Sequence, residues 1–211
     1  MEKESQVIFD KNVIEFVTVA AEFCAFLERA ESMKRSTFVD TTLKILPLLY
    51  LKASMLPKCE MIGDESPETY VTEEIYEVLR INLASILAEK DDYLEVFLPD
   101  MAYSDEPIKK NISEDLADIY QDIKDFIFVF QLGLNETMND SLAICQENFG
   151  LLWGQKLVNT MRALHDVKYS PKARGEDEEE EEYEPENNED CHCEDDDCHC
   201  HDHGCHCHDD E

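Results

Sequence analysis

The chain has 211 residues, of which 50 are Asp or Glu and 18 are Lys or Arg, so its formal net charge is −32. Such a composition lacks the clustered basic side chains that contact phosphates, which argues against binding to nucleic acid and against adhesion to anionic membranes. The charge is uneven, because residues 176–211 hold 19 of the acidic residues and no Lys or Arg. The sequence therefore divides into a body of the size of one domain and an acidic tail.

Targeting signals are not apparent. The first five residues are charged or polar apart from Met1, and they precede no apolar stretch typical of a signal peptide. The longest apolar runs, such as residues 126–130, are far shorter than the roughly 20 residues of a membrane span. We therefore expect a cytoplasmic protein whose cysteines remain thiols or bind metal.

Apolar residues recur in the body at steps of three and four, and alternating period-two segments are absent. This pattern predicts an all-α bundle of five or six helices over residues 1–170. Asn12 with Glu15 suggests a capping box, Pro47 predicts a kink or a break, and residues 126–130 are expected at the centre of the bundle or under a partner. The expected helices are residues 12–31, 36–54, 72–90, 113–132 and 136–165.

Gly150 and Gly154 lie four residues apart in the last expected helix. This spacing favours close packing against another backbone, with a simple bend as the alternative. Tyr93 to Leu98 is expected to form a short apolar turn before Pro99. The acid pairs Asp91-Asp92 and Glu114-Asp115 are expected on the solvated surface or at helix starts.

Three segments of the body carry a family resemblance. They are Glu15-Phe16-Val17, Glu22-Phe23-Cys24 and Lys44-Ile45-Leu46-Pro47-Leu48-Leu49-Tyr50. With them the chain resembles an uncharacterised bacterial helical family, domain of unknown function 5063, over most of residues 7–170. The resemblance implies a helical fold and no particular activity or site.

No familiar catalytic motif is present in the body. It contains neither Gly-rich phosphate loop nor H-E-x-x-H, and its one histidine, His165, has Arg162 three residues before it, which excludes a di-iron bundle site. His165 to Lys168 match the His-x-x-Lys core of histidine phosphotransfer bundles, but Tyr169 replaces the glycine that follows in that family. A cation that complements the helix dipole explains His165 equally well. We therefore expect no enzyme here, unless the bundle holds a deep polar pocket.

The body has three scattered cysteines. Cys24 and Cys145 fall in apolar helical stretches and are expected to be buried, whereas Cys59 lies in a loop and is a candidate for exposure. Its one basic neighbour, Lys58, does not indicate a strongly lowered thiol pKa.

The tail has two parts. Residues 171–190 form an acidic linker that is too polar to fold and is expected to be disordered, and residues 191–211 carry a repeat. The triplet Cys-His-Cys occurs three times with a period of seven residues. The candidate metal ligands are Cys191, His192, Cys193, Cys198, His199, Cys200, His201, His203, Cys205, His206, Cys207 and His208.

These twelve ligands could form up to three Cys2His2 sites, although the spacing is not that of a zinc finger. Thiolate and imidazole suit Zn(II) best, with Ni(II) or Cu(I) as alternatives. The surrounding carboxylates raise the pKa values of nearby thiols and imidazoles, so metal binding should weaken below neutral pH.

The sequence thus predicts a non-catalytic, cytoplasmic protein that stores, buffers or delivers a transition metal, with a metal-recipient or basic protein as a possible partner. The alternative is a helical protein-interaction module with an acidic surface, in which the tail is incidental or a metal-dependent switch.

Overall fold

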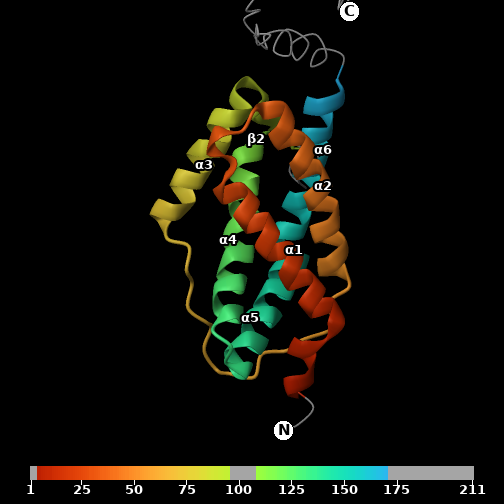
Figure 1. The fold of residues 1–211 in the computed structure, drawn as a ribbon, viewed down its shortest axis with the longest axis vertical. Coiled ribbons are helices and arrows are strands. Elements are labelled where there is room, and N and C mark those ends of the chain that lie inside the picture. The colour runs from red at the N-terminus through yellow and green to blue at the C-terminus, as the bar shows by residue number, and fades with distance from the viewer. Residues whose placement is uncertain (1–3, 96–107, 171–211) are drawn as a thin grey trace, which may run out of the picture.

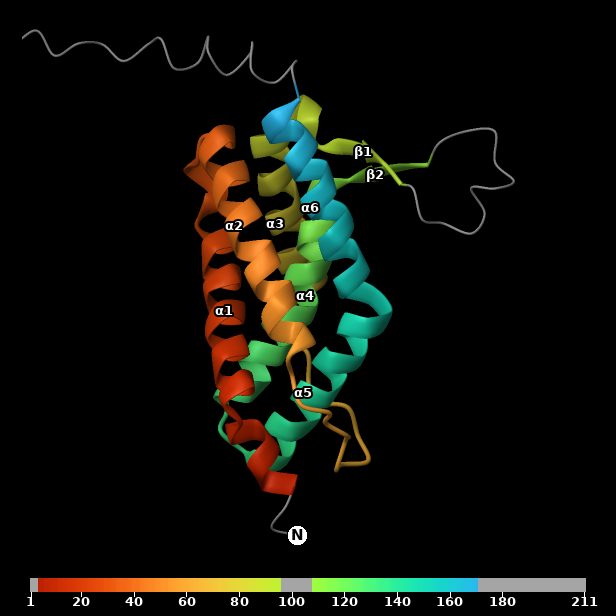
Figure 2. The ribbon, with the colours of Figure 1, turned by 90° about the vertical axis from the view of Figure 1, so that its right-hand side faces the viewer.

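The fold is built around α4 (Ile112–Gln131), which packs against four other helices of the bundle (Figures 1 and 2). The computed structural model describes residues 4–95 and 108–170. The all-α prediction is confirmed within these residues. The other helices are α1 (Lys11–Glu28), α2 (Arg35–Ser54), α3 (Glu73–Leu87), α5 (Asn135–Asn148) and α6 (Gly154–Tyr169), with short 3-10 turns at Glu4–Phe9, Ala30–Ser32 and Ala88–Lys90.

The apolar stripe of α4 forms much of the core. Leu116, Ile119 and Ile123 are fully buried, and Phe126 and Ile127 are nearly so. The rings of Phe126 and Phe16 of α1 lie 5.5 Å apart. The prediction that residues 126–130 lie within the bundle is confirmed, because α1, α3, α5 and α6 surround this helix.

Of two local predictions for α1 and α2, the capping box at Asn12 is wrong, and the break at Pro47, one of the two alternatives there, is not observed. The side chain of Asp10, not Asn12, caps α1, and it accepts a hydrogen bond from the Asn12 amide at 2.8 Å. The second helix continues without a break through Pro47, which lies on the exposed side between the buried residues Leu46 and Leu49. Packing of these neighbours holds the helix together where one backbone hydrogen bond is lost.

The sequence gives no sign of the two short strands that connect α3 to α4. Strand β1 (Asp92–Leu94) pairs antiparallel with β2 (Lys109–Asn111), with Tyr93 opposite Lys110, and the pair projects from the side of the bundle (Figure 2). Three residues are too few to show a period of two. The turn expected at residues 93–98 is therefore partly a strand.

The helix expected over residues 136–165 is two helices joined by a π-helical segment, Phe149–Trp153. A Cβ atom at Gly150 would meet nothing within 4 Å, whereas one at Gly154 would meet the Phe149 carbonyl oxygen and lie 2.9 Å from the Phe149 ring. The predicted close packing of the glycine pair against another backbone is therefore not observed, and the crowding at Gly154 comes from the π segment just before it. None of the described helices is both long and apolar enough to cross a membrane.

Candidate functional site

The predicted metal ligands, Cys191 to His208, lie outside the described residues. So does the acidic linker, residues 171–190. Over residues 4–95 and 108–170, no group of three or more His, Cys, Asp or Glu side chains is placed to hold a metal ion. The described body therefore adds no metal centre of its own to the one predicted for the tail.

The tail continues from the last turn of α6, which is fixed on α2. Lys168 of α6 forms an ion pair with Asp40 of α2, and Lys44 pairs with the same carboxylate. These two lysines, Lys168 first, hold the pKa of Asp40 at about 2. The end of the body from which the tail continues is thus tied to the neighbouring helix.

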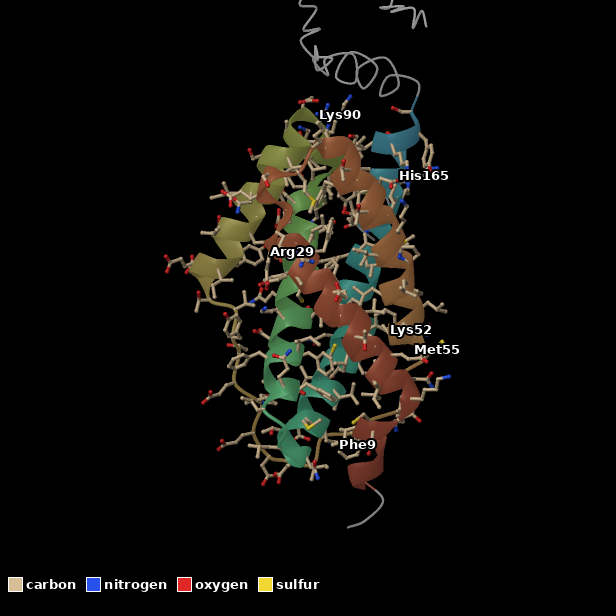
Figure 3. All side chains as sticks on the ribbon, in the orientation of Figure 1. Phe9, Arg29, Lys52, Met55, Lys90 and His165 are labelled. Atoms are coloured by element: carbon tan, nitrogen blue, oxygen red, sulfur yellow. The ribbon has the colours of Figure 1, made fainter. Side chains whose placement is uncertain are left out.

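His165 lies on the outer side of α6 near its C-terminal end, as predicted (Figure 3). Its ring contacts that of Tyr169, with the centroids 4.6 Å apart. Lys168, the second residue of the His-x-x-Lys pattern, is engaged by Asp40. An exposed imidazole at this position fits the dipole interpretation rather than a phosphotransfer site.

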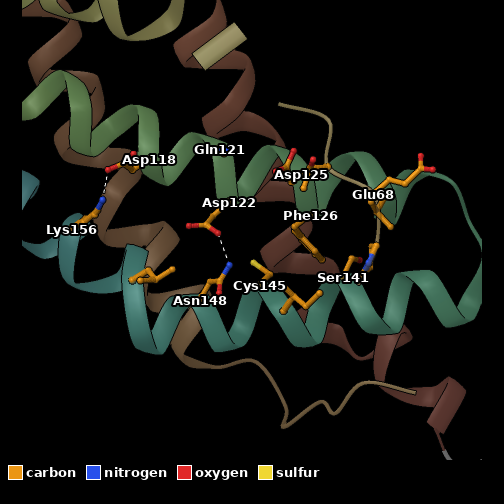
Figure 4. A pocket seen from close by; sticks show the side chains of 15 residues that line it. Glu68, Asp118, Gln121, Asp122, Asp125, Phe126, Ser141, Cys145, Asn148 and Lys156 are labelled. Carbon is orange, nitrogen blue, oxygen red and sulfur yellow. Dashed lines mark hydrogen bonds and ion pairs between the residues drawn. The ribbon is translucent and has the colours of Figure 1, made fainter. Parts of the chain in front are cut away.

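A cavity of about 400 Å³ lies between α4 and the chain from α5 to α6, and the loop before α3 closes one end (Figure 4). We call it the acidic pocket. Three of its four carboxylates come from one face of α4, and its apolar residues come from α4 and from the chain between α5 and α6. The lining residues that define it include Glu68, Asp118, Asp122, Asp125, Phe126, Val129, Ile144, Cys145, Asn148, Leu152 and Lys156.

Asp118 links three helices at one end of the acidic pocket. Its carboxylate forms an ion pair with Lys156 of α6 and accepts a hydrogen bond from the Tyr76 hydroxyl of α3 at 2.8 Å. Burial, together with this carboxylate, raises the pKa of Tyr76, so the phenol remains a donor at neutral pH. The negative charge of Asp118 is thereby balanced by Lys156 within the protein.

Asp122 lies at the middle of the acidic pocket. It accepts a hydrogen bond from the Asn148 side chain at 2.6 Å. Burial raises the pKa of Asp122, and the neighbouring charge of Asp125 adds to this effect. No ion pair to Asp122 is present among the described residues, unlike Asp118, although Lys156 is near enough to lower the pKa of this half-buried carboxyl in part.

Asp125 connects the acidic pocket to the loop between α2 and α3, residues 57–72, which we call the strap. One carboxylate oxygen of Asp125 accepts hydrogen bonds from the amides of Tyr70 and Val71, both at 2.7 Å. Burial raises the pKa of Asp125 despite these two donors. The strap is therefore attached to the same helix face that lines the pocket.

Helix α5 holds the other end of the strap (Figure 1). The buried carboxylate of Asp140 accepts hydrogen bonds from the amides of Ile62 and Gly63 at 2.7 and 2.9 Å. The amide group of Asn139 donates to the Glu60 carbonyl at 2.8 Å. The sequence did not lead us to predict a role for Asp140 and Asn139, although polar residues within a helix that must pack on α4 are a signal of such contacts.

The three body cysteines are weakly nucleophilic in this structure. Cys24 and Cys145 are buried as predicted, and burial raises the pKa of Cys24 to about 12 and that of Cys145 well above its usual range. Cys59 is only half-buried, and its thiol donates to the Asn139 side chain at 3.2 Å. Burial also raises the pKa of Cys59. A thiolate mechanism has no activated sulfur in the described body.

The acid pairs expected on the surface include two buried carboxylates. Asp91 accepts hydrogen bonds from the amide and the hydroxyl of Ser113, both at 2.7 Å, and so caps the start of α4. Asp115 is 4% exposed and accepts a hydrogen bond from the Tyr93 hydroxyl of β1. The prediction of a helix start is confirmed for Glu114 and Asp115, which lie in the first turn of α4, and Asp91 caps that helix, whereas the surface alternative is wrong for the buried Asp91 and Asp115.

The segment that forms this bundle also matches a known family model. The model described as Domain of unknown function (DUF5063) matches residues 7–170. The chain belongs to this family. The match ends where α6 ends, so it covers the helices, the strap and the acidic pocket of this DUF5063 chain, and the tail lies beyond it.

One solved structure is very similar to this DUF5063 chain. It is a crystal structure of protein BF1032 from Bacteroides fragilis, with 93% sequence identity and a TM-score of 0.72. The match covers 80% of this chain and 99% of that chain. Among curated proteins, no relative matches.

Proposed function

We propose that this DUF5063 chain is a non-catalytic cytoplasmic protein that binds transition-metal ions through its tail and stores, buffers or delivers them. The observation that carries the proposal is the triplet Cys-His-Cys, which occurs three times between Cys191 and Cys207 with a period of seven residues. An acidic tail that serves only solubility requires no cysteine or histidine, and it requires no regular repeat of them.

The ligand chemistry supports Zn(II) first. Two thiolates one residue apart can bind the same ion, and an adjacent imidazole can complete a tetrahedral set. Twelve such ligands are enough for up to three Cys2His2 sites. Ni(II) and Cu(I) accept the same donors, so the bound metal also depends on what the cell supplies.

The acidic residues support this function through their negative electrostatic potential. Residues 176–190 hold many carboxylates and no basic residue, which creates a negative potential that raises the local concentration of cations. Cys191 lies 21 positions beyond Ser170, the residue after α6. The proposed sites are therefore attached to, but separate from, a body whose last turn is fixed by Lys168 and Asp40.

A competition titration tests the proposal. The reduced, metal-free full chain would be titrated with Zn(II) against a chromophoric chelator, beside a variant with all six tail cysteines changed to Ser and a Cys59→Ser control. We expect the six-Ser variant to lose affinity on the order of 100-fold, because thiolates are the strongest ligands in the set. The Cys59→Ser chain should match the parent chain. Equal binding by the six-Ser variant would overturn the proposal.

A further inference from the structure

The acidic pocket has an excess of negative charge that the protein leaves uncompensated. Four carboxylates, Glu68, Asp118, Asp122 and Asp125, share its lining with one basic residue, Lys156. Lys156 is already paired with Asp118. The hydrogen bonds to Asp125 come from backbone amides and use one of its oxygens, which leaves the other oxygen available. Asp122 therefore shares the single cation Lys156 with Asp118, and Asp125 has no ion pair among the described residues.

The size and the apolar wall of the pocket suit a small organic molecule. Ligand pockets in proteins range from roughly 300 to 1,000 Å³, and this cavity of about 400 Å³ is within that range. Phe126 and Val129 of α4, together with Ile144 and Leu152 from the chain between α5 and α6, give the pocket an apolar wall beside the carboxylates. A ligand that combines a cationic group with a short hydrocarbon chain would match both surfaces.

Cys145 extends the apolar wall of the pocket. Its side chain is 2% exposed, and it lies in the wall of the pocket (Figure 4). It belongs to the hydrophobic core, and its backbone carbonyl accepts a hydrogen bond from the Trp153 indole at 3.1 Å. The wall of the pocket is therefore connected directly to Trp153.

The number of ligands favours an organic cation over a metal ion. Asp118 and Asp125 are seven residues apart on α4, about 10 Å along the helix axis, so one ion cannot be coordinated by both. Asp122 and Asp125 lie three residues apart on one helix face, but the described residues offer no group of three ligands placed to hold a metal ion. A cationic organic group can instead contact Asp122 and Asp125 together.

The π-helical segment shapes this site. Residues Phe149–Trp153 interrupt the chain between α5 and α6, where Asn148, Leu152 and Lys156 face the pocket. Such segments are rare and often occur at functional sites. The interruption thus places an amide, an apolar side chain and an amine beside the α4 carboxylates.

From these observations we propose that the acidic pocket binds a small organic cation, an alkylammonium or guanidinium group on a short apolar chain, with Asp122 as its principal counter-ion and Asp125 as a second contact. The same chemistry is present in a free diamine and in a lysine side chain of a peptide. The site lies in the body, so this proposal and the metal-binding proposal for the tail can fail independently.

Trp153 is the only tryptophan of the chain and is fully buried in the segment that borders the pocket. Putrescine would be titrated into the full chain at low salt while the fluorescence of Trp153 is followed. Amine that binds diffusely to the acidic tail should leave this signal unchanged, whereas amine in the pocket should change it with saturation. Titration with 1,4-butanediol, which has the same chain without charge, should give no response.

Two substitutions that each remove one negative charge distinguish binding in the pocket from general electrostatic attraction by the acidic protein. We expect Asp122→Asn to weaken putrescine binding about tenfold or more, because it removes the half-buried counter-ion. The matched control is Glu147→Gln, an exposed residue of α5 outside the pocket, which should change binding less than about twofold. Lys156→Gln removes the competing amine and should strengthen binding, which gives a second readout if Asp122→Asn lowers the melting temperature.

The outcomes are distinct. A saturable Trp153 signal that Asp122→Asn weakens and Lys156→Gln strengthens supports the proposal. If an acetylated and amidated lysine tripeptide then binds more tightly than putrescine, the natural source of the cation is a protein side chain, and the reverse order indicates a free amine. No saturable signal, or equal effects of Asp122→Asn and Glu147→Gln, would overturn the proposal.

Discussion

Asp91 holds the start of α4 through two hydrogen bonds to a single residue, Ser113. The carboxylate is buried, and it replaces a cap that the side chain of the adjacent Asn111 does not provide. An amide and a hydroxyl would lose their acceptor if this side chain were removed. Local carboxylates of this kind stabilise the fold more than the many exposed ion pairs do.

We predict that Asp91→Ala lowers the free energy of unfolding by about 1–3 kcal/mol, because it leaves a buried amide without an acceptor. The matched control is Asp92→Ala, which removes an exposed carboxylate that pairs with Lys109 at 2.5 Å and should lower the free energy of unfolding clearly less. Urea unfolding of the three chains measures both values. Equal losses in the two variants would contradict the capping role.

Asp115 gives a prediction on pH. Burial raises its pKa from 3.8 to about 6, although the hydrogen bond from Tyr93 opposes this. Between these values the folded chain holds a proton that the unfolded chain has released. The contribution of Asp115 to stability therefore falls as the pH rises through this window, and at neutral pH a buried charge remains.

Asp115→Asn carries no charge at any pH and can still accept a hydrogen bond from Tyr93. We expect the difference in free energy of unfolding between this variant and the parent chain to be more favourable to the variant at neutral pH than near pH 4, by on the order of 1 kcal/mol. Denaturant unfolding of both chains at the two pH values measures the difference, and ionisations shared by the two chains cancel. A stability difference that is independent of pH would contradict the buried-charge account.

At the scale of elements, the strap depends on side chains of other helices. Asp140 binds the Ile62 and Gly63 amides, and Asp125 binds those of Tyr70 and Val71. The partners lie 54 to 78 residues apart in the sequence. No local pattern encodes such pairs, so the sequence shows the strap as a loop and does not show where it is fixed.

Removing one anchor should loosen the strap without unfolding the bundle. We predict that Asp140→Ala speeds hydrogen exchange of the Ile62 and Gly63 amides by on the order of 10-fold or more, because the acceptor that protects them is gone. Asp64→Ala, at an exposed strap residue, is the control and should leave exchange unchanged. If the core amides of α4 exchange faster to the same extent, Asp140 supports the whole bundle and the prediction fails.

The two glycines of the π segment region should respond to alanine in opposite directions. Gly150 has open space at its Cβ position and no positive φ. Gly150→Ala should therefore stabilise the protein by about 0.4–1 kcal/mol, because alanine lowers the conformational entropy of the unfolded chain. Gly154→Ala forces a methyl group against the Phe149 carbonyl oxygen and ring, and it should destabilise the protein by about 1–3 kcal/mol. Thermal unfolding of the pair tests the segment, and a similar effect of both changes would contradict its geometry.

The helices were predictable where one face is apolar over several turns. Residues such as Leu116, Ile119 and Ile123 of α4 repeat at helical spacing and are buried accordingly. The strands at Tyr93 and Lys110 are too short to show a period, and their pairing depends on a partner 17 residues away. The π segment and the acidic pocket escaped prediction because both arise from the way α5 and α6 meet α4, which single-helix patterns do not contain.

At the scale of the whole molecule, this DUF5063 chain combines a helical body with a tail of different chemistry. The family match ends at residue 170, and the twelve candidate ligands lie beyond residue 190. The body contributes a fixed attachment at α6 and the acidic pocket, and the tail contributes the proposed metal sites. The proposed function therefore depends on the claim that the tail holds a transition metal in the cell.

Elemental analysis of the untagged chain, purified under reducing conditions beside a version truncated after Gly175, tests that claim most directly. We predict that one transition metal co-purifies with the full chain at neutral pH, is absent from the truncated chain, and is lost on mild acidification as thiols and imidazoles regain protons. Full chain and truncation that are both free of metal, or that carry equal amounts of it, would contradict the account.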